Sequence, residues 1–140
     1  MLGNPSAIWD GTPNGLPGRC TTTYPISLGT IPDAYVFKNA DVWRGLVFLC
    51  GWNNANGFTT MSPPNSTMCF YTNPDFGVAP PTSYHSGGVN LGLLDGSVRF
   101  ITNTIDCGNS NAYAVKTGPS PFGVFGALGS PNGGEASGVP

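Results

Sequence analysis

The stretch His85-Ser-Gly-Gly-Val-Asn-Leu-Gly-Leu-Leu-Asp-Gly-Ser-Val-Arg-Phe-Ile101 decides the fold of this chain, because it predicts a β-hairpin from its letters alone. Asp95-Gly96 favours a two-residue type I′ turn, whose two central positions both need positive φ. Closing the turn there pairs Leu94 with Ser97, Leu93 with Val98, Gly92 with Arg99 and Leu91 with Phe100. One face then gathers the apolar side chains Val89, Leu91, Leu93, Val98 and Phe100, and the other carries mainly Asn90, Gly92, Ser97 and Arg99. Because a slip of one residue would scramble these faces, we predict a fixed register with the apolar face on a core.

The composition fits one domain of 140 residues with a modest core. Only 9% of the residues are charged, whereas 21 glycines and 14 prolines make up a quarter of the chain. Helix interiors tolerate glycine and proline poorly, so short strands joined by many turns are expected. The sequence therefore predicts an α+β fold leaning mainly β, with an antiparallel sheet and long Gly/Pro-rich loops. A net charge of −2, with five scattered basic residues, argues against a nucleic-acid partner.

The chain is expected to have three parts. Residues 1–19 read as an irregular N-terminal segment, residues 20–117 as the globular domain, and residues 118–140 as a Gly/Pro/Ser-rich C-terminal segment. The apolar nucleus 122–128 of the last segment is expected to dock on its own domain or on a neighbouring subunit.

Inside the globular part, strands are expected near 21–28 and 46–50, and a long loop over 51–80. Residues 33–43 fit either a short helix or a strand. The apolar run 45–51 is too short to cross a bilayer and reads as a buried strand. The sequence shows neither a membrane segment nor a signal peptide, so for an exported protein the export information is expected to have been removed.

The four cysteines are even in number and widely spaced, at Cys20, Cys50, Cys69 and Cys107. The sequence contains no C-x-x-C pair, which argues against a zinc ribbon, a thioredoxin-type site and covalent haem attachment. Two disulfides are the natural interpretation, and they imply an oxidising, extracellular or cell-surface location. Four buried free thiols are the alternative, and the sequence does not choose among the three pairings.

His85 is the sole histidine, so any site that needs two is excluded. Extending the hairpin register places His85 opposite Asp106, where an imidazole–carboxylate hydrogen bond would hold the base of the hairpin together. A Ser-His-Asp triad with Asp95 or Asp106 is formally possible, but no nucleophile motif accompanies it. We therefore expect structural roles for both residues, with Asp95 making the turn, and no enzymatic activity.

Other candidate sites are weaker. Arg99 could pair with Asp75, Asp106 or a partner subunit, or remain solvated. No cofactor is expected, although Asp75, Asp106 and backbone carbonyls could form a calcium loop that nothing requires. Asn65-Ser66-Thr67 matches a glycosylation sequon.

Several blocks of the sequence resemble a bacterial prepilin-like family, of type IV pilin or pseudopilin character, whose C-terminal domain is named for an H-x9-D-G motif. The motif corresponds here to His85, nine residues and Asp95-Gly96, and the likeness extends over Gly87, Gly88, Val89, Asn90 and the run 95–101. Residues 58–69 are similar to the Pro-Pro-Asn segment of that family, and residues 125–135 to its closing segment. The closing segment departs at Phe125-Gly126, where the family has Trp-Arg.

The resemblance implies a pilin-like globular head and a non-enzymatic structural protein of a surface filament or secretion assembly. Family members begin with a prepilin cleavage site and a long apolar helix, and the present sequence contains neither. We expect a domain fragment or a protein that self-associates through its globular surfaces and termini. The alternative is a cell-surface module that binds a glycan, peptide or metal ion, using exposed aromatic residues such as Trp9, Trp43 or Trp52.

Overall fold

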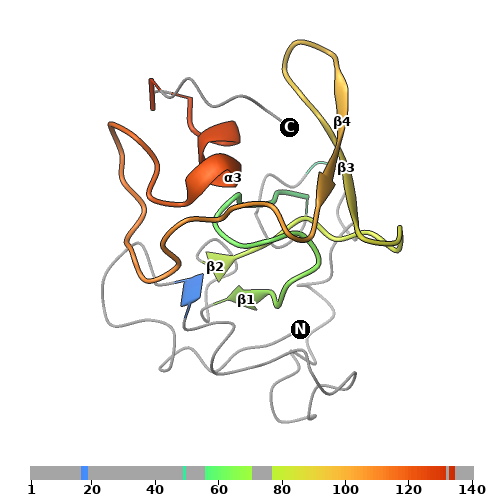
Figure 1. Ribbon diagram of the computed structural model, residues 1–140, viewed down its shortest axis with the longest axis horizontal. Coiled ribbons are helices and arrows are strands. Elements are labelled where there is room, and N and C mark those ends of the chain that lie inside the picture. Colours follow the sequence, from blue (N-terminus) through green and yellow to red (C-terminus); the bar gives the residue numbers. More distant parts are fainter. Residues whose placement is uncertain (1–16, 19–48, 50–55, 71–76, 132, 135–140) are drawn as a thin grey trace, which may run out of the picture.

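The computed structural model describes residues 17–18, 49, 56–70, 77–131 and 133–134 (Figure 1). In this part of the chain, strand β1 (Cys69–Phe70) pairs with β2 (Gly77–Val78), and β3 (Gly88–Gly92) pairs with β4 (Val98–Thr102). Both pairs are antiparallel, and the short helix α3 (Gly123–Leu128) follows them. The prediction of an α+β fold that leans mainly β, with antiparallel pairing, is confirmed.

The turn of the β3–β4 hairpin has three residues, Leu94 to Gly96, rather than two. The Gly96 N–H donates to the Leu93 carbonyl at 3.0 Å, and the Leu93 N–H donates to the Ser97 carbonyl at 2.8 Å. Gly96 has a φ of 83°, whereas Asp95 does not lie in the positive-φ region. This arrangement is a type I turn followed by a left-handed glycine, so the prediction of a type I′ turn is wrong.

The longer turn shifts the strand pairing by one residue from the predicted register. Leu91 lies opposite Arg99, and Asn90 opposite Phe100. Since side chains alternate between faces along a strand, the shift exchanges the two faces of β4 relative to β3. The pairs predicted from the sequence are therefore wrong, although the hairpin itself lies where it was expected.

The exchange of faces decides which apolar side chains are buried. Val89 and Ile101 face the core, with 2% and 1% of their surface exposed. Val98 and Phe100 face solvent, with 69% and 48% exposed. The prediction of a buried side chain holds for Val89 and is wrong for Val98 and Phe100.

Helix α3 packs on the hairpin through one aromatic ring. Phe125 is fully buried and forms a cluster with Val89 and Ile101. The partly buried side chains around this cluster are Leu91, Ile105, Cys107 and Leu128. A six-residue helix is not stable on its own, so this packing helps to hold α3 in place.

The segment before the hairpin is more ordered than the expected long loop, because β1 and β2 lie within it. The Thr59 N–H donates to the Ala79 carbonyl at 2.7 Å, and the Ala79 N–H donates to Thr59 Oγ1 at 3.0 Å. Leu49 lies in a turn and is 90% exposed, which contradicts the prediction of a buried strand there.

Several predictions lie outside the described residues, including the strand near 21–28, the element at 33–43 and nearly all of the N-terminal segment 1–19. From that segment the structure describes Pro17 and Gly18, which are both buried. None of the helices in the described ranges is long and apolar enough to span a membrane.

Candidate functional site

The two glycines after His85 allow the hairpin strands to approach closely at their base. Gly87 has a φ of 81°, and its carbonyl accepts a hydrogen bond from the Asn103 N–H at 2.8 Å. A side chain at Gly88 would press on the backbone carbonyl of Ile101 and lie 2.8 Å from the ring of Phe100. Gly87 is therefore explained by its positive φ, and Gly88 by the lack of space for a side chain.

Asp95 stabilises the turn at the other end of the hairpin. Its Oδ1 accepts a hydrogen bond from the Ser97 N–H at 2.8 Å. Hydrogen bonding from Ser97 lowers the pKa of Asp95 from its ordinary value, and the positive charge of Arg99 adds to this effect. Arg99 and Asn90 are both exposed. The Asp95-Gly96 pair is thus fully explained by the geometry of the turn.

His85 does not lie opposite Asp106, so the predicted imidazole–carboxylate clamp is wrong. The ladder ends at the Gly88–Thr102 pair, and its register differs by one residue from the one that placed the two residues together. His85 is exposed, and its backbone N–H donates to Ser83 Oγ at 3.2 Å. The carboxylate of Asp106 is used elsewhere.

Asp106 holds the start of helix α3. The helix has no side-chain cap of its own at Phe122. Asp106 Oδ2 accepts from the Val124 N–H at 3.4 Å, and its backbone carbonyl accepts from the Phe125 N–H at 3.0 Å. Its Oδ1 accepts from the Gly108 N–H at 2.8 Å. Asp106 therefore satisfies N–H groups that a helix start leaves open, and its Asp-x-Gly setting is a local signal for that turn.

Asn65 joins three segments, a role that the sequence analysis missed. Its φ is 60°, and its N–H donates to the Pro81 carbonyl at 2.9 Å. Its side-chain oxygen accepts from the Ser83 N–H at 2.8 Å, and its Nδ2 donates to Asn103 Oδ1 at 2.9 Å. The same amide nitrogen would carry a glycan at the sequon, and attachment would leave it a single N–H. The tolerance of asparagine for left-handed backbone, directly after Pro63-Pro64, was the signal that could have identified it.

Cys107 carries a free, half-buried thiol, which differs from the expectation that all four cysteines are paired. Burial raises the pKa of this thiol to about 11, and the negative charge of Asp106 adds to the rise. Cys20 and Cys50 lie outside the described residues, and the side chain of Cys69 is not described either. A disulfide among those three therefore stays a prediction.

A family model described as a protein of unknown function (DUF1559) matches residues 3–108. The chain belongs to this family. The match includes β1 to β4, and therefore the hairpin and its turn, and it ends before α3. No curated protein and no solved structure matches the chain.

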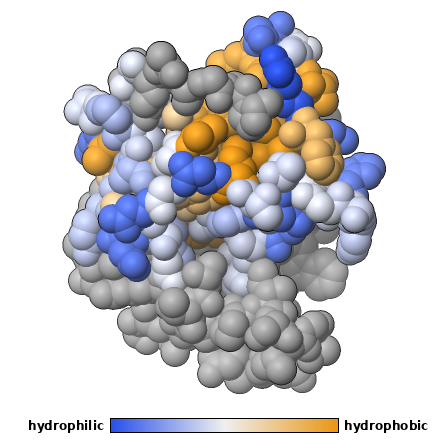
Figure 2. All heavy atoms as spheres, viewed as in Figure 1, coloured by the Kyte–Doolittle hydropathy of each residue, from blue (hydrophilic) through white to orange (hydrophobic). Residues whose placement is uncertain are grey.

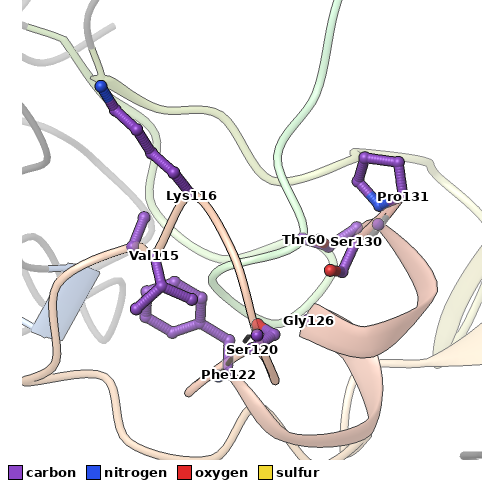
Figure 3. A pocket seen from close by; sticks show the side chains of 11 residues that line it. Thr60, Val115, Lys116, Ser120, Phe122, Gly126, Ser130 and Pro131 are labelled. Atoms are coloured by element: carbon purple, nitrogen blue, oxygen red, sulfur yellow. Dashed lines mark hydrogen bonds between the residues drawn. The ribbon is translucent and has the colours of Figure 1, made fainter. Parts of the chain in front are cut away.

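The described part of this DUF1559 chain has two cavities of note. One of about 170 Å³ is lined partly by hydroxyl groups, and the Lys116 side chain extends away from the Thr60 and Ser130 hydroxyls there (Figure 3). The other, of about 550 Å³, lies at the end of β4 beside Val124 of α3. The smaller cavity brings no acid, base or nucleophile pair together.

The remaining sites expected in this DUF1559 chain stay untested. Among the described residues, no group of three His, Cys, Asp or Glu side chains is placed to hold a metal ion. Asp75 and the three tryptophans Trp9, Trp43 and Trp52 lie outside those residues. The calcium loop and the aromatic binding surface therefore remain predictions.

Proposed function

We propose that this protein is a non-enzymatic structural subunit at the cell surface, of the pilin or pseudopilin kind, that associates with copies of itself in a filament or secretion assembly. The resemblance of its H-x9-D-G, Pro-Pro-Asn and closing segments to prepilin-like proteins supports the kind of protein. The exposed apolar face of the β3–β4 hairpin supports the association with identical copies.

The observation that carries the proposal is the apolar outer face of the β3–β4 hairpin. Val98 and Phe100 project from β4 into solvent, and Leu94 at the turn is fully exposed. Figure 2 shows hydrophobic surface gathered over the hairpin and extending towards α3. Contiguous apolar surface of this kind marks sites of protein contact. Only 9% of the residues are charged and the net charge is −2, so electrostatic repulsion between identical copies is expected to be small.

The residues of the H-x9-D-G motif support the non-enzymatic part of the proposal. Gly87, Gly88, Asp95 and Gly96 have structural explanations in the hairpin, and His85 stands exposed at the opposite end from Asp95. A catalytic acid–base pair needs its groups within hydrogen-bond reach, directly or through one water. We therefore interpret the glycines and Asp95 of the motif as residues that the structure of the hairpin requires, and not as an active site.

Sedimentation velocity over a wide range of protein concentration tests the proposal. We expect the purified chain to form concentration-dependent oligomers, with elongated particles by electron microscopy. The variant Val98→Thr, Phe100→Thr keeps the strand but makes its outer face polar, so its association is expected to weaken. A wild-type chain that stays monomeric at every concentration and ionic strength would refute self-association.

A separate test addresses the absence of enzymatic activity. We expect no hydrolysis of ester, peptide or glycoside substrates. Turnover that is abolished by His85→Ala and by Asp95→Asn, with the fold intact by circular dichroism, would show that the motif is catalytic and the proposal wrong.

A further inference from the structure

Residues 115–119 form an exposed stretch of chain between the hairpin and α3. All five are exposed, and they lie outside the helices and strands. Within the described part of the chain, no hydrogen bond holds any of them. A side chain placed at Gly118 would meet nothing within 4 Å. Exposed loops with few hydrogen bonds open locally and are the preferred sites at which endopeptidases cut a folded protein.

Lys116 supplies the residue that a trypsin-like endopeptidase recognises. Such an enzyme holds a basic side chain in a pocket that contains an aspartate. The Lys116 side chain extends away from the Thr60 and Ser130 hydroxyls and is exposed (Figure 3). The described residues contain one other basic side chain, that of Arg99, which lies in β4 opposite Leu91. Strand pairing withholds the Arg99 backbone from a protease, so Lys116 is the favoured position of the two.

The chain after the exposed stretch is held by residues that precede it. Phe125 of α3 is fully buried against Val89 and Ile101 of the hairpin. Gly129, directly after α3, lies so close to Thr60 that a side chain at the glycine would overlap the Thr60 hydroxyl. The helix is therefore fixed by packing against two earlier parts of the chain.

Backbone hydrogen bonds also join the two sides of the exposed stretch. The Phe125 N–H donates to the Asp106 carbonyl at 3.0 Å, and the Val124 N–H donates to Asp106 Oδ2 at 3.4 Å. The Asn109 N–H donates to the Pro121 carbonyl at 2.9 Å. None of these contacts passes through the exposed stretch, so all of them remain when the stretch is cut.

From these features we propose that an endopeptidase of trypsin-like specificity cuts the folded protein at Lys116–Thr117, and that residues 117–140 stay bound to the hairpin through α3. Hydrolysis breaks the bond between the Lys116 carbonyl carbon and the Thr117 nitrogen. Water supplies the hydroxyl of the new carboxyl group and the hydrogen of the new amine. Both new ends lie in the exposed stretch, so their charges remain in water. The inference does not depend on the proposed self-association.

The cut changes how α3 is held. In the intact chain the connecting segment keeps the helix near its site at an effective concentration of about millimolar order. After the cut the contact becomes bimolecular, so dilution separates the fragments. The face formed by Val89 and Ile101 then acts as a binding site for the segment 117–140, which can exchange with free copies of that segment.

Limited digestion of the native full chain with trypsin, followed by mass spectrometry, tests the site. Residues 117–140 contain no lysine or arginine, so the mass of this fragment reports cleavage after Lys116 alone. Cleavage after Arg99 is measured in the same sample, and each rate is divided by the rate at that bond in the urea-unfolded chain. We expect the corrected rate at Lys116 to exceed that at Arg99 at least about tenfold.

Two variants serve as controls for this measurement. Lys116→Gln should yield no fragment 117–140, whereas Arg99→Gln, the matched control, should leave its rate of formation unchanged. A corrected ratio below about tenfold would overturn the cleavage site, because cutting would then follow general unfolding of the chain.

Size-exclusion chromatography of the cut protein tests whether α3 stays in place. Lys116 becomes the sole trypsin site in a variant that carries Arg19→Gln, Lys38→Gln, Arg44→Gln and Arg99→Gln. We expect its two fragments to co-elute at high protein concentration and to separate on dilution. Circular dichroism establishes that the variant is folded before the cut. If it is not, native mass spectrometry of the cut wild type measures the same retention.

Substitution of the buried ring identifies the anchor. Phe125→Leu keeps an apolar side chain and should retain the fragment better than Phe125→Ala, whose fragment should dissociate at least about tenfold more readily than that of the parent chain. Fragments that separate at the highest concentration would overturn the retention. Equal retention with phenylalanine and alanine at this position would show that α3 is not what holds the segment.

Discussion

Replacing Asn65 tests whether one side chain holds three segments of the fold together. Asn65→Ala removes the acceptor for the Ser83 N–H and the donor to Asn103, and each such bond contributes about 0.5–1.5 kcal/mol net. An alanine at the φ of 60° adds about 1–2 kcal/mol of steric cost. The sum is about 2–5 kcal/mol, a large part of the 5–15 kcal/mol that stabilises a typical domain.

Two further variants separate these contributions. Asn65→Gly removes the same two side-chain bonds but accepts the left-handed backbone, so it should cost less than alanine. Asn65→Asp keeps the acceptor for Ser83 and tolerates the backbone, so it should cost least. Urea unfolding followed by circular dichroism gives the free energy of unfolding of each variant. The reasoning fails if alanine costs no more than glycine, or if glycine is as stable as wild type within about 0.3 kcal/mol.

Three other predictions concern the core, the thiol and the turn. Phe125→Ala should lower the free energy of unfolding by about 3–5 kcal/mol because the ring fills the cluster with Val89 and Ile101, and a loss below about 1 kcal/mol in urea unfolding would contradict that packing. Cys107, with its pKa raised to about 11 from an ordinary 9.0, should hold about a hundredfold less thiolate at pH 8 than an unperturbed cysteine. Mass spectrometry of its peptide after iodoacetamide treatment of the native protein should show correspondingly slow alkylation, and a rate equal to that of a free cysteine would rule out the burial. The lowered pKa of Asp95 means that its ionised form stabilises the hairpin above the unfolded-state pKa, near 3.8, and that this contribution disappears as the pH falls through the lower folded-state value. NMR titration of the Asp95 carboxyl should therefore give a pKa below 3.8. This pKa should rise more in Ser97→Pro, which lacks the donating N–H, than in Arg99→Gln. An Asp95 pKa at or above 3.8 in the wild type would show that the turn does not favour the carboxylate.

The position of the hairpin could be predicted from the sequence, but its register could not. Asp95-Gly96 is compatible with a type I′ turn and with a type I turn followed by a left-handed glycine. The two turns differ in length and in whether Asp95 adopts positive φ, which costs a non-glycine residue about 1–2 kcal/mol and aspartate less. The expected His85–Asp106 pairing depended on the rejected register and failed with it.

Burial of apolar side chains does not choose between the two registers either. The predicted register would bury the exposed parts of Val98 and Phe100, worth about 1–2 kcal/mol each. It would also expose Ile101, which costs about 1.5–3 kcal/mol. These free-energy terms nearly cancel. Small differences in turn energy and the packing of Phe125 against Ile101 can therefore decide which register forms. The roles of Asn65 and Asp106 were hard to predict because important partners of their side chains are distant in sequence. Asn65 bonds to Ser83 and Asn103, and Asp106 to Val124, all 18 or more residues away.

The observed register has a consequence for how the protein acts. Within the described residues, the hairpin packs on a core through one face, so the apolar residues on the two faces of β4 are not all buried. The structure buries Ile101 and leaves Val98, Phe100 and Leu94 in solvent. A neighbouring copy that covers these side chains recovers the burial that the hairpin gives up, since apolar surface gains free energy when it leaves water regardless of which chain covers it. The same turn that sets the register also lifts Leu94 clear of the strands. In the proposed assembly, the Asp-Gly pair would therefore have two effects, because it fixes the register of the hairpin and thereby determines which apolar residues face a neighbouring copy.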